Sequence, residues 1–296
     1  MDSYGPICFT ESFGEGNLLE SDAHSGILND ADALSLAMMT HMRWPVGHEL
    51  RIGFKGGTQW QKYQVKKYAP EWCQDANTKF SFVDSGELDI LIAFDPSAGS
   101  WSRIGTDCRK YSSSNKPSMN LGWINDNKHE DDIRAVILHE FGHALGAVHE
   151  HSSPYAKIPW DREKVYRDLS GHPHYWDKGR IKRNMFQYYT LANVRATTFD
   201  PDSIMLYSFP DSWTTNGKGT ARNTKLSASD KEFAKSCYPA TDTSCISLRA
   251  PDHPGRNKQE SPTVYLHSRP FRKLKKAGSY FNFRSLVTKI KNAIDV

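Results

Sequence analysis

The chain has 296 residues, with 38% hydrophobic and 12% aromatic side chains, which is enough for one or two globular domains with a buried core. No run of eighteen apolar residues occurs, so no transmembrane helix is expected. The first residues lack a basic segment followed by an apolar run. No secretory signal peptide is therefore predicted, and the sequence alone favours an intracellular location.

Charge is distributed unevenly along the chain. Residues 1–42 hold seven acidic side chains and no Lys or Arg, whereas residues 247–296 hold eleven Lys or Arg against three acids, a net charge of +8. The whole chain carries +4, so its basic character belongs to the C-terminal tail. The net charge therefore gives no reason to expect a nucleic-acid partner.

Hydrophobic periodicity and turn residues predict alternating elements along the chain. Helices are predicted at 30–42, at 59–76 with a break at Pro70, at 129–145, at 162–169, and directly after 226–230. Strands are predicted at 49–54, 79–83 and 88–94, with the turn 84–86 between the last two. Irregular segments are predicted at 171–177 and 214–222.

The most specific pattern is H-E-x-x-H-x-x-G-x-x-H, which starts at His139. On a helix, His139 and His143 project from one face on adjacent turns, close enough to share a metal ion. Gly146 can adopt a left-handed turn that returns the chain and brings His149 to the same ion. Three imidazoles leave one zinc position open, as in catalytic sites, so one Zn²⁺ per chain is predicted. Glu140, beside the first ligand, is the predicted general base.

A second element, at residues 200–207, joins turn-forming residues to a methionine and a tyrosine. On its own this element is weak evidence for a function, because a methionine usually just fills space in a hydrophobic core. Together with the histidine motif it resembles the Met-turn of metzincin metallopeptidases, with Met205 beneath the zinc-bound imidazoles. Tyr207 matches the extra tyrosine ligand of the astacin family, and Glu150 matches the glutamate after the third histidine. The chain thus resembles the astacin-like zinc metalloproteases, above all the fungal and bacterial type.

The resemblance covers roughly residues 41–240 and implies the architecture. Residues 88–94 look like the central strand of the sheet, 99–106 like the loop after it, and 119–123 like the edge strand bordering the cleft. The implied fold class is α+β: a two-lobed, metzincin-like zinc protease domain with a mixed twisted sheet, an active-site helix and an irregular C-terminal lobe. The predicted domains are an acidic N-terminal leader (1–40) in the place of a pro-segment, the catalytic domain (41–240) and a basic tail (241–296).

The predicted function is a zinc-dependent endopeptidase that hydrolyses peptide bonds with water activated by the metal and Glu140 as general base. The resemblance implies that Tyr207, a metal ligand, then donates a hydrogen bond to the oxyanion. The implied substrate is an extended protein or peptide segment, antiparallel to the edge strand. The chain is expected to be a monomer, and the resemblance, unlike the N-terminal sequence, suggests secretion.

Two alternatives come from other classes of protein. The first is an inactive zinc protein that binds peptides without cutting them, against which the intact Glu140 argues. The second is an interaction protein that acts through its basic tail, where Lys and Arg alternate with aromatic residues and could contact an anionic surface. A disordered solubilising tail is the simpler interpretation.

Other polar residues have simpler interpretations. His151, next to the motif, is expected to be an exposed loop residue. Five widely spaced cysteines do not form a disulfide scaffold, so free thiols are the default, with the pairs Cys73–Cys108 and Cys237–Cys245 left open. The aromatic residues of 155–189 are expected to pack in the core rather than line substrate pockets.

Overall fold

The computed structural model describes residues 18–19 and 38–240, apart from positions 173, 190, 192, 193 and 197. These residues belong to one unit, Met1–Cys245. The predictions for residues 20–37 and for the basic tail lie outside the described residues. No helix in the described part of the chain is long and apolar enough to cross a membrane.

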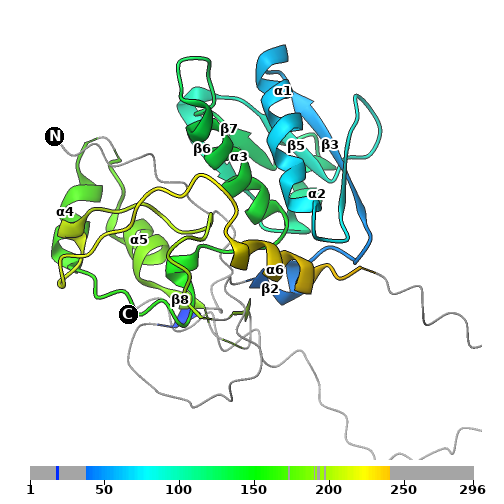
Figure 1. Ribbon diagram of the computed structural model, residues 1–296. Coiled ribbons are helices and arrows are strands. Elements are labelled where there is room, and N and C mark those ends of the chain that lie inside the picture. Colours follow the sequence, from blue (N-terminus) through cyan, green and yellow to red (C-terminus); the bar gives the residue numbers. More distant parts are fainter. Residues whose placement is uncertain are drawn as a thin grey trace, which may run out of the picture. The chain divides into compact units, whose positions relative to one another are not determined.

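The first half of the described chain contains a mixed five-stranded sheet (Figure 1). Its strand order is β4 (Lys79–Phe82), β3 (Glu49–Lys55), β5 (Ile90–Ala93), β7 (Met119–Leu121) and β6 (Ser100–Ser102). The first four strands are parallel, and β6 runs antiparallel to β7. The predicted α+β class is confirmed, and β5 is the central strand, as expected.

The edge strand differs from the prediction. Residues 119–121 form β7, which lies between β5 and β6, so the strand expected at the edge is internal. The edge is β6, within the segment that was expected to be a loop. The turn 84–86 connects β4 and β5, which pair with opposite sides of β3. These pairings are between distant segments, and the local pattern does not specify them.

The helices predicted at 59–76 and 129–145 form close to their predicted positions, whereas the short helix α2 (Asp107–Ser112) was not predicted. The helix α1 (Gln59–Tyr68) begins at Thr58, where a capping box with Gln61 satisfies two backbone donors. It passes into the 3-10 helix η2 (Ala69–Cys73), which contains the predicted break at Pro70. The helix α3 (Glu130–Ala144) packs against α1, β6 and β7 (Figure 1). The helix α2 contacts β5.

The prediction of a helix at 30–42 is wrong for residues 38–42, the part of this range that the structure describes. Met38–Met39 form a short strand, β2, antiparallel to β9 (Val194–Arg195), and Thr40–Met42 form the 3-10 helix η1. The backbone N–H of Met39 also donates to the carbonyl of Gly146. Tertiary pairing with the segment after the active-site helix outweighs the helical spacing of the methionines.

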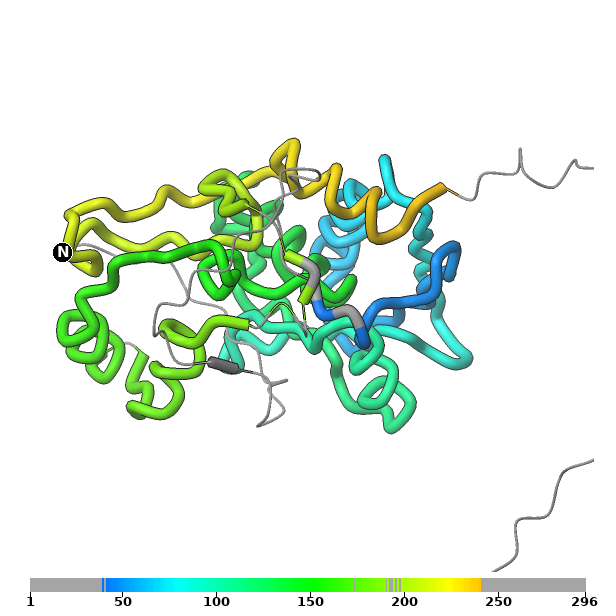
Figure 2. Tube along the Cα trace, turned by 90° about the horizontal axis from the view of Figure 1, so that it is seen from below, coloured from blue at the N-terminus to red at the C-terminus, as the bar shows by residue number. Residues whose placement is uncertain are grey.

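The second half of the chain consists mainly of short helices and irregular connections. It contains η4 (Glu150–Ser152), α4 (Arg162–Ser170), α5 (Lys178–Ile181), the π-helix η5 (Lys182–Phe186), η6 (Asp211–Trp213) and α6 (Ala228–Cys237). The strand β8 (Tyr188–Tyr189) pairs with β1 (Leu18–Leu19). An isolated bridge joins Trp160 to Thr214, so the segment after residue 200 runs beside the one that leads into α4 (Figure 2).

Two hydrophobic clusters meet at the segment 204–207. The larger joins the sheet to α1, α3 and α6 and includes Ile204 and Met205. The second contains the aromatic residues of the C-terminal half, together with Leu206 and Tyr207. The expectation that the aromatics of 155–189 pack in a core is confirmed for Trp176 and Phe186 but is wrong for Tyr175, which is 70% exposed. The four consecutive residues 204–207 therefore connect both cores directly behind the histidine motif.

Candidate metal centre

The histidine motif begins on a helix whose ends are set by its sequence. His139 and His143 lie one turn apart near the C-terminal end of α3. The helix ends in a Schellman motif, in which Ala147 N–H donates to the Gly142 carbonyl and Gly146 N–H to that of His143. Gly146 has the positive φ (105°) that this reversal requires. The returning chain then brings His149 opposite the helix.

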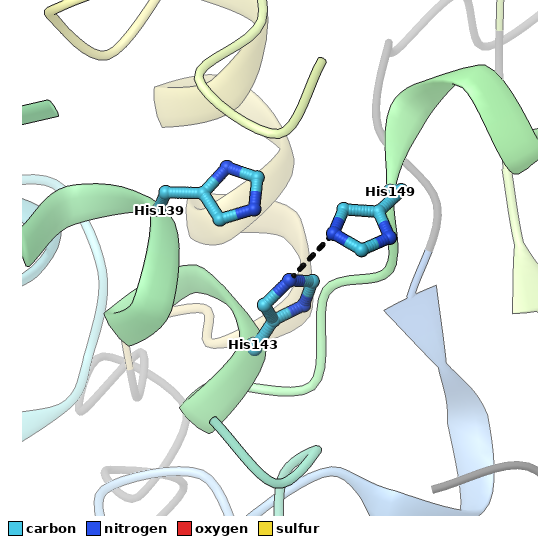
Figure 3. A group of neighbouring side chains, drawn as sticks. All are labelled: His139, His143 and His149. Atoms are coloured by element: carbon cyan, nitrogen blue, oxygen red, sulfur yellow. Dashed lines mark hydrogen bonds between the residues drawn. The ribbon is translucent and has the colours of Figure 1, made fainter. Parts of the chain in front are cut away.

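The three imidazoles converge (Figure 3). One ligand atom from each histidine lies within 4.8 Å of the other two. The Nε2 atoms of His143 and His149 are 3.0 Å apart, a separation that two Zn–N bonds of about 2.0–2.1 Å can span. His143 and His149 are fully buried, and His139 is partly exposed.

Hydrogen bonds to backbone carbonyls orient two of the rings. His139 Nδ1 lies 2.8 Å from the Ile204 carbonyl oxygen, and His143 Nδ1 lies 2.9 Å from that of Ala147. Each Nδ1–H donates to its carbonyl, because a carbonyl oxygen can only accept, so each Nε2 carries the lone pair. His139 Nε2 is buried and has no hydrogen-bond partner among the described residues. An orphaned buried acceptor of this kind fits a metal ligand.

The surroundings keep the imidazoles neutral, as metal binding requires. Burial lowers the pKa of His139 to about 4, and the Ile204 carbonyl opposes this shift only in part. Burial, followed by the neighbouring imidazoles, lowers the pKa of His143 and of His149 well below the usual value. The donor set, the lone pairs and the protonation state thus all fit zinc.

The turn after Asp200 packs against α3 and contacts His139 through the Ile204 carbonyl. Met205 is fully buried, and its sulfur lies against Gly142 of α3. Asp230, at the start of α6, accepts hydrogen bonds from Ser203 Oγ and Ile204 N–H. These bonds hold the Ile204 carbonyl where it meets His139. Asp230 was not predicted as part of the site, although it is the acidic residue of a capping box with Ser227.

Glu140 and Tyr207 both lie close to the histidine cluster. Glu140 follows His139 on α3 and is buried. The Tyr207 ring is buried too, with its centroid 4.1 Å from that of His149 and 6.2 Å from that of His139. The sequence-predicted site residues are therefore brought together, while the roles of Glu140 and Tyr207 stay predictions.

One neighbour of the motif was predicted wrongly. His151 is not an exposed loop residue but is 1% exposed, with its ring 4.5 Å from that of Tyr207. The 3-10 helix η4 directs it inward, a local turn that the sequence pattern did not reveal. The described thiols of Cys73 and Cys108 are free, which excludes a bond between them.

Fold, donor set and motif together define a zinc metalloendopeptidase. No model of a protein family and no curated protein matches the chain. Among solved structures, one of myroilysin shares 40% identity and a TM-score of 0.67 over 69% of this chain and 98% of that one. Another myroilysin structure shares 34% identity and a TM-score of 0.56 over 81% and 93%. A weaker match, at 15% identity and a TM-score of 0.46 over 70% and 98%, is High choriolytic enzyme 1, a hatching enzyme zinc-protease from Oryzias latipes (medaka fish). The chain belongs to the astacin-like zinc metalloproteases of the metzincin clan.

Proposed function

We propose that this zinc metalloprotease cleaves extended protein or peptide substrates with Glu140 as the general base. The observation that supports this most is the convergence of three neutral imidazoles, two of them buried, with Glu140 adjacent to His139 on the same helix. The zinc held by His139, His143 and His149 would polarise the scissile carbonyl and lower the pKa of the attacking water. The alternative of a binding protein without activity is disfavoured because the residue needed as base is present.

In the proposed mechanism Glu140 transfers a proton between two groups. Its carboxylate accepts a proton from the attacking water and delivers it to the departing amine. The low accessibility of Glu140 suits this task, because a carboxylate shielded from bulk water exchanges its proton with the substrate rather than with solvent.

Tyr207 has a second proposed role. Its ring packs on His149, so its phenol lies in the same cluster as the metal ligands. We propose that the phenol is an additional metal ligand in the resting enzyme. When substrate is bound, the hydroxyl instead donates a hydrogen bond to the oxygen of the attacked carbonyl.

The substrate would add as a further strand to β6, the antiparallel one of the two edge strands of the described sheet. Arg103 N–H bonds to the Ser118 carbonyl, and Gly122 N–H bonds to that of Gly99, so odd-numbered residues of this strand face β7. By alternation, the backbone groups of Ser100 and Ser102 face away from β7. Both serines are buried, so a substrate must first gain access to this edge.

Replacing Glu140 by Gln tests the proposal. The variant should keep about one zinc per chain and its fold, and lose casein hydrolysis by several orders of magnitude, since the amide cannot accept the proton. Removal of zinc by a chelator should abolish wild-type activity, and added zinc should restore it. Cleavage of casein by the Gln variant at the wild-type rate would refute the role of Glu140. Mapping the cut sites would give the sequence preference.

The remaining predictions concern the chain outside the metal centre. They are the monomeric state, the contact of the basic tail with anionic surfaces, the location of the protein, and the boundaries of the leader and tail. Adding anionic vesicles to the full-length protein and to a variant that ends at residue 240 would test the role of the tail.

A further inference from the structure

We propose that His151 is a positioning residue for Tyr207, fixing the phenol ring beside the metal ligands. This inference rests on the role proposed above for Tyr207. His151 lies two residues after the last histidine of the motif and is not in the group of three that could hold a metal ion. Its contribution would therefore be made through Tyr207.

The Tyr207 ring packs against two imidazoles, and the three rings contact one another pairwise. Its centroid lies 4.1 Å from that of His149 at an interplanar angle of 44°, and 4.5 Å from that of His151 at 27°. The two imidazoles are themselves stacked, with centroids 5.3 Å apart. A zinc ion bound by the three histidines would orient His149, and His151 would then be the second fixed surface that restricts the phenol ring. Without it, the ring would gain rotational freedom on that side.

His151 is fixed from the opposite side by the C-terminal lobe. Its Nε2 lies 2.6 Å from the backbone carbonyl oxygen of Asn184, to which it must donate. Asn184 belongs to the π-helix η5, a type of helix that is often found at functional sites. The side-chain amide of Asn184 in turn donates to the carbonyl of Arg180. Trp160 closes the remaining side, with its ring perpendicular to that of His151.

This arrangement is more specific than ordinary core packing. A buried imidazole is costly unless its polar atoms are satisfied, and an aliphatic side chain would fill the space more cheaply. In the described residues only Nε2 of His151 has a partner, while the buried Nδ1 has none. An imidazole thus provides both a flat surface for Tyr207 and a hydrogen bond that sets the tilt of this surface. A side chain that only fills volume needs neither a flat surface nor this hydrogen bond.

The test combines kinetics with a spectroscopic signal from the metal site. In protein loaded with Cu²⁺ in place of zinc, a coordinated phenol gives a phenolate-to-copper absorption band that Tyr207→Phe abolishes. His151→Ala should keep about one zinc per chain, lower kcat at least about tenfold with KM changed less than about twofold, and shift or weaken the copper band. His151→Phe, which keeps a flat ring but cannot donate to the Asn184 carbonyl, should recover only part of the band and of kcat. His172→Ala, at an exposed histidine in the same lobe, is the control and should change neither.

The double variant Tyr207→Phe/His151→Ala decides between positioning and an independent role. If His151 acts through Tyr207, the double variant should be no slower than Tyr207→Phe alone. Independent losses that multiply, or an unchanged copper band in His151→Ala, would overturn the inference and leave the role of Tyr207 intact. Wild-type kcat in Tyr207→Phe would instead overturn the role of Tyr207, and this inference with it. Neither outcome affects the proposal for Glu140, which has its own variant.

Discussion

Met205 and Gly142 are in direct contact, although 63 positions separate them in the chain. A Cβ added to Gly142 would lie 2.3 Å from the sulfur of Met205 and 3.1 Å from Cζ2 of Trp72. Only a glycine on α3 allows the methionine to approach this closely. The contact places the turn so that the Ile204 carbonyl reaches Nδ1 of His139. Gly142, which lies between the two histidines of the zinc-binding helix at a position that the motif leaves variable, therefore has a packing role.

Replacing Gly142 by Ala should destabilise the protein and weaken zinc binding. Overpacking typically costs about 1–3 kcal/mol, which exceeds the gain in helix propensity of about 1 kcal/mol. The displaced turn should also release His139, so the zinc affinity should fall. Urea unfolding and a competition titration with a zinc chelator would measure the two effects.

Two further variants test whether the contact with Met205 causes the effects of Gly142→Ala. Gly171→Ala is the matched control, because Gly171 has an ordinary negative φ and a Cβ there would find its nearest neighbour at 3.6 Å. It should change zinc affinity very little. Shortening the methionine in Gly142→Ala/Met205→Ala should relieve the clash, so this pair should be less destabilised than the sum of the single changes. Strict additivity would show that the contact with Met205 is not the reason for the glycine.

Zinc binding should depend on all three histidines. Purified protein should contain about one zinc per chain, and His143→Ala should lose most of it, because two imidazoles rarely retain a catalytic zinc. Metal analysis by mass spectrometry would measure both values. His172→Ala, outside the cluster, should keep full zinc content. Stoichiometric zinc in His143→Ala would remove that residue from the metal centre.

The metal centre could be predicted because its geometry is local. His139, His143 and Gly146 lie on a single helix and its C-terminal turn, and their spacing alone sets their directions. Met205 and Tyr207 were predicted through a family resemblance. No local pattern in the sequence could show that Met205 contacts Gly142. Asp230 and His151 escaped prediction, because both become buried only through tertiary contacts with distant segments.

The fold was predicted in its elements more than in its pairings. The strand β3 and the helix α1 have clear patterns and capping signals, and both formed where expected. The order of strands in the sheet depends on contacts between distant segments, so the edge was assigned to β7 instead of β6. The strand β2 was mistaken for part of a helix for the same reason, because its partner β9 lies more than 150 residues away.

Replacing Tyr207 by Phe should separate catalysis from packing. The ring keeps its contacts with His149 and His151, so the fold and KM should change little. Loss of the hydroxyl should lower kcat by about 10²–10³-fold if it stabilises the transition state. Steady-state kinetics on a fluorogenic peptide would give both parameters. Ser208, the next residue in the chain, is partly exposed. Ser208→Ala is therefore the control. Unchanged kcat in Tyr207→Phe would leave Tyr207 as a packing residue.

Asp89 should make the stability of the N-terminal half dependent on pH. Burial on its own would raise the pKa of this carboxyl, but hydrogen bonds from Arg51 N–H, Arg109 and His48 outweigh it and hold the pKa below the usual value. A carboxyl with a lowered pKa in the folded state stabilises the protein above the unfolded pKa of about 3.9. This contribution is lost as the pH falls through the lower, folded value. Asp89→Asn should therefore lower the free energy of unfolding by about 1–3 kcal/mol at pH 7, because Arg109 loses its charged acceptor and the other hydrogen bonds to the carboxylate are weakened.

The difference in stability between wild type and Asp89→Asn should narrow as the pH falls below about 4, where the wild-type carboxyl also becomes protonated. Urea unfolding followed by tryptophan fluorescence at a series of pH values would measure the difference. Both proteins should be treated with a chelator, so that zinc release and self-cleavage do not contribute. Asp126→Asn, at an exposed turn residue, is the control and should match wild type throughout. A difference between wild type and Asp89→Asn that stays constant from pH 7 to pH 3 would show that the charge of Asp89 is not what stabilises this region.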